Sequence, residues 1–143
     1  MKIPQDRADF LLQMEKHALG TQYNFPTSGG KLAIPLVSAD GREDFLLDIY
    51  RGGIAICGSF QNRVYITCIL ARLCFGGKPH TNPDGETIQG THIHIYREGY
   101  GDKWAYPLPN QDFPVINDTR TIFSEFMRFC NITKQPSFIS PLL

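Results

Sequence analysis

Between residues 31 and 108 the chain alternates short runs of apolar and β-branched residues with glycine-containing turns. Residues 45–49 show this most clearly, because Phe45, Leu47 and Ile49 occupy every second position. Side chains two apart on a strand share a face, so such a run can bury one face of a sheet. Residues 64–75 form the longest β-rich run and are expected to be one long strand. The pattern predicts an antiparallel meander of five or six strands over residues 31–108.

Helical spacing of apolar residues flanks this region on both sides. It predicts an N-terminal helix over residues 1–20 and a C-terminal helix over residues 118–131. The apolar face of the first is formed by Phe10, Leu11, Met14 and Ala18. The apolar face of the second is formed by Ile122, Phe126, Phe129 and Cys130, with Asn117 or Asp118 as its cap. The chain has 143 residues, the size of one ordinary domain. We therefore expect a single α+β domain spanning residues 1–143.

Charge and cysteine usage narrow the class of protein. The formal net charge is zero, which argues against a broad basic surface for nucleic acid but leaves a local basic groove open. No apolar run approaches the roughly 20 residues that span a bilayer, and residues 1–19 lack the apolar core of a signal segment. None of the four cysteines forms a CxxC pair. A thiol-reduced, cytoplasmic protein without a membrane partner is the expectation.

Three of the four histidines lie within fifteen residues of one another. His92 and His94 are two apart on an expected strand, so both point to one face while Ile93 points to the core. His80 lies in the preceding loop, just before an Asn-Pro-Asp-Gly turn. This cluster is the main candidate for chemistry in the chain.

The first interpretation of the cluster is a Zn²⁺ site. Imidazole is the commonest metal ligand in proteins, and His80, His92 and His94 offer three imidazoles. Cys74 would be the fourth ligand, provided that its strand lies beside the histidine strand. Cys68, Arg72 and Cys74 share one parity on that expected strand. His92, His94 and Glu98 also match part of a cupin metal motif, but its flanking glycines are out of place.

Two further interpretations remain open. Metal-free phosphodiester cleavage would use His92 and His94 as base and acid, with Arg72, Arg97 or Lys103 neutralising the phosphate. Under this alternative the partner would be nucleic acid. A histidine pair on a half-exposed sheet can also have no chemical role at all.

Residues 96–104 form a second prominent feature, with glycines at 99 and 101 between aromatic and charged residues. One interpretation is a tight hairpin whose aromatic residues pack on their neighbours. The other is a contact loop for a protein partner, in which Tyr100, Lys103 and Trp104 are the binding residues.

The run PHTNPDG at residues 79–85, followed by HIHIYREGYGDKWA at residues 92–105, resembles an uncharacterised family of small bacterial and phage proteins. The resemblance covers residues 44–132. It implies an association with mobile-element toxins and anti-defence proteins of the anti-CRISPR kind. Cys74 stands where the resemblance implies an aspartate, which keeps zinc binding available but weakens a mechanism that needs a carboxylate base there.

Together these observations predict a small zinc-binding, non-enzymatic protein that binds and inhibits a protein partner, with a host defence nuclease as the expected partner. The alternative is a metal-independent toxin of the RNase type that uses His92 and His94, with Arg97 at the phosphate.

Overall fold

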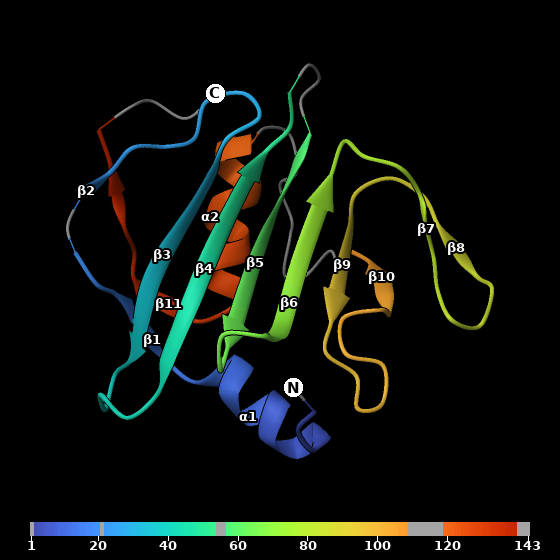
Figure 1. Cartoon of the computed structure of the whole chain (residues 1–143), viewed down its shortest axis with the longest axis horizontal. Coiled ribbons are helices and arrows are strands. Elements are labelled where there is room, and N and C mark those ends of the chain that lie inside the picture. Colours follow the sequence, from blue (N-terminus) through green and yellow to red (C-terminus); the bar gives the residue numbers. More distant parts are fainter. Residues whose placement is uncertain (1, 21, 54–56, 109–118, 140–143) are drawn as a thin grey trace.

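The computed structural model describes residues 2–20, 22–53, 57–108 and 119–139, and it is an α+β fold built on one large sheet (Figure 1). The sheet has eight strands in the order β10-β9-β6-β5-β4-β3-β1-β11. These are β1 (Lys16–Ala18), β3 (Lys31–Ser38), β4 (Asp44–Arg51), β5 (Gly58–Val64), β6 (Cys68–Phe75), β9 (His92–Ile95), β10 (Ala105–Pro107) and β11 (Ile132–Lys134). All neighbours pair antiparallel except β1 and β11.

Two short ribbons and two helices complete the described chain. The ribbons pair β2 (Gln22–Tyr23) with β12 (Ser137–Phe138), and β7 (His80–Thr81) with β8 (Thr87–Ile88). The helices are α1 (Gln5–Gln13) and α2 (Thr119–Phe129). Neither is long and apolar enough to cross a membrane.

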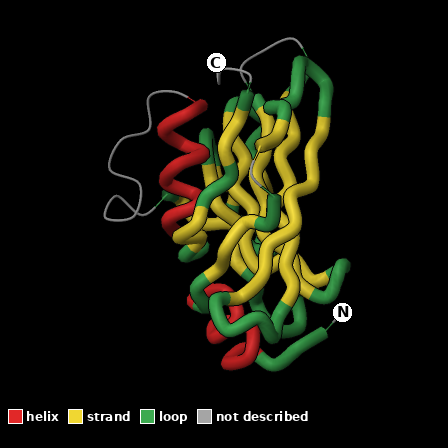
Figure 2. Tube along the Cα trace, turned by 90° about the vertical axis from the view of Figure 1, so that its left-hand side faces the viewer, coloured by secondary structure: helices red, strands yellow, loops and turns green. Residues whose placement is uncertain are grey.

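The core lies on the face of the sheet that α2 covers, and α1 packs at one end of the strands (Figures 1 and 2). Phe60 on β5 meets Phe123 and Phe126 of α2 there, with ring centroids 4.8 and 6.1 Å apart. All three rings are at most 1% exposed. Burying one such ring contributes roughly 2 to 3 kcal/mol. This packing fixes which face of every strand is turned inward.

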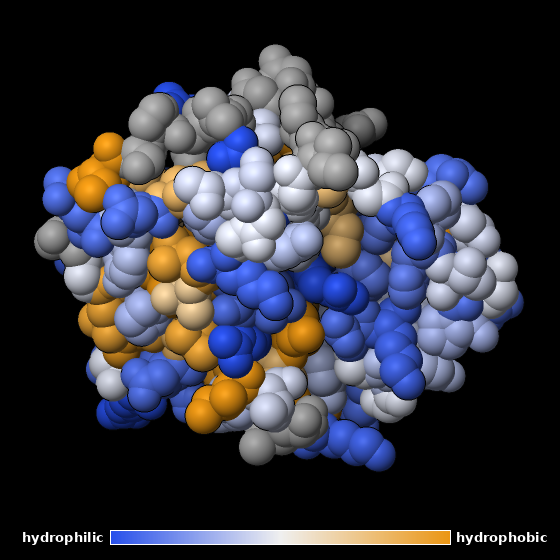
Figure 3. Space-filling model, turned by 45° about the horizontal axis from the view of Figure 1, so that its top comes forward, coloured by the Kyte–Doolittle hydropathy of each residue, from blue (hydrophilic) through white to orange (hydrophobic). Residues whose placement is uncertain are grey.

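No helix of the described residues covers the opposite face of the sheet, where polar side chains of β4, β5, β6 and β9 gather. Strand register aligns them in two rows across the sheet. One row runs Tyr50, Ser59, Cys74, His92, and the other runs Asp48, Gln61, Arg72, His94. In the space-filling view the side of β7 and β8 is mostly hydrophilic, while hydrophobic patches lie on the opposite side and near the centre (Figure 3). The histidines therefore belong to the polar end of this open face.

The prediction of a helix over residues 1–20 is wrong beyond Gln13. Met14 is already extended, with φ −61° and ψ 134°, and residues 16–18 form β1 between β3 and β11. Lys16 is fully buried there, and its Nζ donates hydrogen bonds to the carbonyls of Leu12, Met14 and Cys130. Pairing with two strands outweighed the helical spacing of a few apolar residues. Together with β11, β1 raises the sheet to eight strands, above the five or six predicted.

The expectation of one strand over residues 64–75 is also wrong. The chain turns back at residues 65–67 between β5 and β6, with positive φ at Tyr65 (53°) and Ile66 (65°). A turn with positive φ at both central positions normally takes Asn or Gly, so no local signal marks this one.

The C-terminal helix ends two residues earlier than predicted. It stops at Phe129, and Asn131 has the left-handed φ of 57°. Position 118 and the proposed caps lie outside the described residues.

Candidate metal centre

Strand pairing brings the sequence-predicted residues together. β6 and β9 are antiparallel neighbours, with Cys74 opposite His92 and Arg72 opposite His94. Ile93 is fully buried in the core, which turns both flanking histidines to the open face. The strand of Cys74 therefore lies beside the histidine strand, as a role for Cys74 as a metal ligand requires. Cys68 does not share that face: the register slips along β6 and leaves it buried on the core side.

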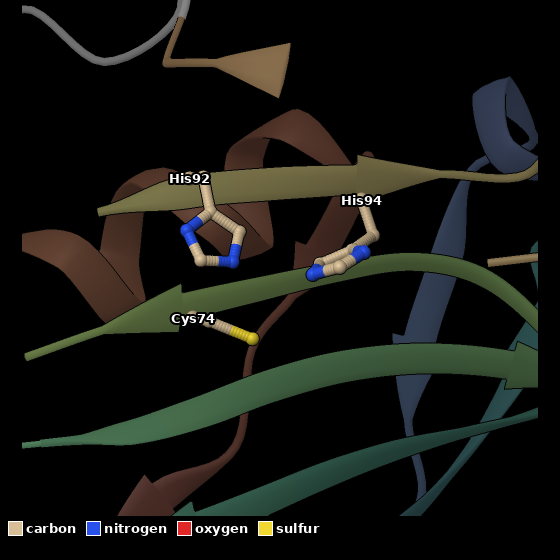
Figure 4. Close-up of side chains that lie close together, drawn as sticks. All are labelled: Cys74, His92 and His94. Carbon is tan, nitrogen blue, oxygen red and sulfur yellow. The ribbon is translucent and has the colours of Figure 1, made fainter. Parts of the chain in front are cut away.

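Cys74, His92 and His94 form a compact group of possible ligand atoms (Figure 4). One ligand atom from each residue lies within 4.8 Å of the others, close enough to hold a metal ion. His92 and His94 point from β9 toward β6, and the sulfur of Cys74 points toward them. A tetrahedral zinc ion keeps its ligand atoms roughly 3.4 Å apart, so a separation at the 4.8 Å bound must close by about 1.4 Å.

Backbone carbonyls fix the tautomer and orientation of the two buried imidazoles. Nδ1 of His92 lies 2.8 Å from the carbonyl oxygen of Gly90, and Nδ1 of His94 lies 2.8 Å from that of Asp102. A carbonyl only accepts, so each Nδ1 must carry the hydrogen. In the neutral imidazole the lone pair is then on Nε2. Ligand histidines in metal proteins are held by this kind of outer hydrogen bond.

His80 lies at the edge of the group, on β7. Its Nε2 donates a hydrogen bond to the carbonyl oxygen of Lys103, at 2.7 Å, which leaves Nδ1 as the atom with a lone pair. Its ring centroid is 4.6 Å from that of His94 and 5.9 Å from that of His92. It does not belong to the compact group, so the three histidines gather as predicted but only two share the cluster with Cys74.

Burial and charge set the protonation of the cluster. Burial, with a contribution from the positive charge of Arg72, lowers the pKa of His94 to about 4. Burial raises the pKa of the Cys74 thiol, against the opposing effect of Arg72. At neutral pH His94 is thus ready to coordinate, while Cys74 must lose a proton when metal binds.

Residues 97–104 form a compact surface cluster and not a loose loop. The guanidinium of Arg97 lies 4.2 Å from the ring centroid of Trp104 and 5.7 Å from that of Tyr100. Tyr100 is 43% exposed, and Lys103 is exposed as well. Arg97 is therefore engaged with aromatic rings, and it does not line the pocket beside the histidines. Glu98 accepts a hydrogen bond from the backbone of Gln5, so it does not complete a cupin-like set with His92 and His94.

Sequence reasoning missed part of the wall around the cluster. A pocket of about 350 Å³ opens beside Cys74, His92 and His94. Arg72, a sequence candidate for phosphate binding, lines it together with Ser59 and Lys78, which were not candidates. Ser59 reaches it through its register with Cys74, which only the β5–β6 turn reveals. Lys78 carries no motif of its own, so nothing in the sequence pointed to it.

The fold and the cluster define an α+β protein with a Cys/His group, compact enough to hold a metal ion, on the open face of a mostly antiparallel sheet. The chain belongs to a family of unknown function, DUF6978, whose model matches residues 3–132. The matched segment contains Cys74, His80, His92 and His94. No curated protein and no solved structure matches the chain.

Proposed function

We propose that the protein binds one Zn²⁺ ion through Cys74, His92 and His94, with His80 beside the group but outside it. The observation that carries the proposal is the compact ligand group together with the two Nδ1 hydrogen bonds that leave Nε2 free. One thiolate and two imidazoles suit zinc, whereas Mg²⁺ and Ca²⁺ prefer oxygen ligands.

Zinc at this position would order the surface that the sequence marks as a contact loop. His94 is hydrogen-bonded to the carbonyl of Asp102, and His80 to that of Lys103. Both carbonyls belong to the segment between Tyr100 and Trp104. Fixing the imidazoles therefore fixes the backbone that presents the Arg97 and aromatic cluster, because outer hydrogen bonds couple ligands to their surroundings.

On this basis we propose a non-enzymatic, protein-binding inhibitor of the phage anti-defence kind, with a host defence nuclease as its partner. What supports the proposal is the exposed aromatic and cationic cluster, of the composition common at interface hot spots, and the family resemblance of the central motif. Stoichiometric inhibition of a nuclease without turnover is the expected behaviour.

The test of the metal site is elemental mass spectrometry on tag-free protein purified without chelator. About one zinc per chain is expected for the wild type and none for the double variant His92→Ala, His94→Ala, with a lower melting temperature because zinc binding stabilises the fold. His17→Ala is the matched control, since His17 lies on β1 beside Glu15, outside the cluster. Wild-type zinc content in the double variant would refute the proposal.

A metal-independent RNase is the second candidate, and one observation favours it. Arg72 lies opposite His94 and lines the pocket with both histidines, so it replaces Arg97 as the group that would neutralise a phosphate. Toxicity on expression that His94→Ala relieves, in protein without bound metal, would favour this function over the inhibitor.

A further inference from the structure

The pocket beside the ligand group is built for negative charge. Its described lining includes the cationic side chains of Arg72 and Lys78 and the hydroxyl of Ser59, but no aspartate or glutamate. Cys74, His92 and His94 form part of its wall, so a ligand in the pocket lies directly beside a bound metal.

Arg72 is held in place by an ion pair and still has N–H groups that can donate to a ligand. Its Nη2 is 3.1 Å from a carboxylate oxygen of Asp102, and this ion pair orients the guanidinium beside His94. Its Nε is buried and has no hydrogen-bond partner among the described residues. A guanidinium presents five N–H donors in a fixed fork that matches carboxylate and phosphate oxygens.

The ligand set itself leaves a position and a charge to be filled. Cys74, His92 and His94 supply three ligands, and His80 lies outside their compact group. Three protein ligands with an open fourth position are typical of zinc sites that bind exogenous groups. One thiolate and two neutral imidazoles leave a zinc ion with a net positive charge. The described lining holds no carboxylate, and Asp102 lies outside it, paired with Arg72.

We propose that the fourth position of the metal takes an exogenous oxyanion, a phosphate or carboxylate oxygen, that also accepts a hydrogen bond from Arg72. This inference rests on the zinc site proposed above and specifies the chemistry of its ligand. It makes Arg72 a binding residue of the site and leaves His80 at the rim of the pocket.

The experiment uses the full chain loaded with Co²⁺ in place of zinc, because the visible spectrum of cobalt reports its coordination. Inorganic phosphate and acetate are titrated separately, with sodium chloride at matched ionic strength as the reference. Each oxyanion is expected to change the cobalt spectrum in a saturable way, while chloride does not. The anion that saturates at the lower concentration distinguishes a phosphate from a carboxylate source. Cobalt content is measured after desalting to show that the metal stayed bound.

The matched variants are Arg72→Gln and Arg63→Gln. Both arginines lie on the open face and pair with an aspartate, but only Arg72 lines this pocket. Arg72→Gln is expected to weaken oxyanion binding about tenfold or more, and Arg63→Gln to leave it unchanged, since a charge-assisted hydrogen bond is lost only in the first.

The outcomes separate the two proposals. A chain that takes up no cobalt overturns the metal site and this inference with it. Stoichiometric cobalt whose spectrum ignores both anions keeps the metal site and overturns the oxyanion. If His80→Ala then makes the spectrum respond to phosphate, His80 is the fourth ligand. Equal weakening by the two arginine variants would overturn the assignment of Arg72.

Discussion

Acidification of the metal-free protein tests how the ligand cluster is built. His94 is 2% exposed, and its pKa is lowered to about 4, chiefly by burial and also by the charge of Arg72. An unfolded chain holds the same imidazole in water, with a pKa near 6.5. Between pH 4 and pH 6.5 the imidazole of residue 94 is protonated in the unfolded chain and neutral in the folded chain. Stability from this group is therefore complete above about pH 6.5 and is lost as the pH falls toward 4.

The magnitude follows from the two pKa values. Each pH unit between them corresponds to about 1.4 kcal/mol, so the full difference amounts to about 3.5 kcal/mol. Solvent in the open pocket screens part of it, which brings the expected loss to between about 2 and 3 kcal/mol. Against a total stability of roughly 5 to 15 kcal/mol for a domain, such a loss is readily measured.

Urea unfolding at pH 7.5 and pH 4.5, with a chelator present, is the assay. The comparison is with His94→Asn, because an Asn amide can still donate to the carbonyl of Asp102 but does not titrate. Other titrating groups affect both proteins, and subtracting one pH dependence from the other removes them. The wild type is expected to lose about 2 to 3 kcal/mol more than the variant. Equal losses in the two proteins would refute the assignment of His94 as a buried, neutral imidazole.

Two further predictions concern Lys16 and Cys74. Lys16→Met leaves the carbonyls of Leu12, Met14 and Cys130 without the donor that Lys16 supplies. We expect the free energy of unfolding, measured in urea, to fall by about 2 to 4 kcal/mol. An unchanged midpoint would show that these hydrogen bonds contribute nothing to stability. Because burial raises the pKa of the Cys74 thiol, the thiol is protonated at neutral pH and zinc binding is expected to release about one proton per ion. Calorimetry in buffers of different ionisation enthalpy measures this release. Binding without proton release would remove Cys74 from the ligand set.

The site was more predictable from sequence than the fold around it. A period of two along residues 92–95 is enough to place His92 and His94 on one face and Ile93 in the core. The role of Cys74 depends on which strand lies beside β9, and that is a tertiary fact. The same limit applies to Arg97. Its position near the histidines in sequence made it a candidate, but in the structure its guanidinium lies over the ring of Trp104 and away from the pocket.

The errors in the fold have a common physical cause. Residues 16–18 and 65–67 carry local patterns that favour a helix and a continuous strand, and long-range pairing overrides both. Lys16 illustrates this, since a lysine is expected at the surface and its burial depends on a carbonyl 114 residues away. Local propensity contains no information about such a partner.

The strands paired at the two ends of the sheet differ in how far apart they lie in the sequence, and this affects how they fold. β1 and β11 are joined across more than a hundred residues, and closing so long a segment is slow and entropically costly. Arg72, Cys74, His92 and His94 lie within one short stretch of the β6–β9 meander, where closure is cheap. The ligand group can therefore assemble in a partly folded chain before β11 docks. In native-state hydrogen exchange, the β1–β11 edge should open first and leave the metal-binding half of the sheet protected.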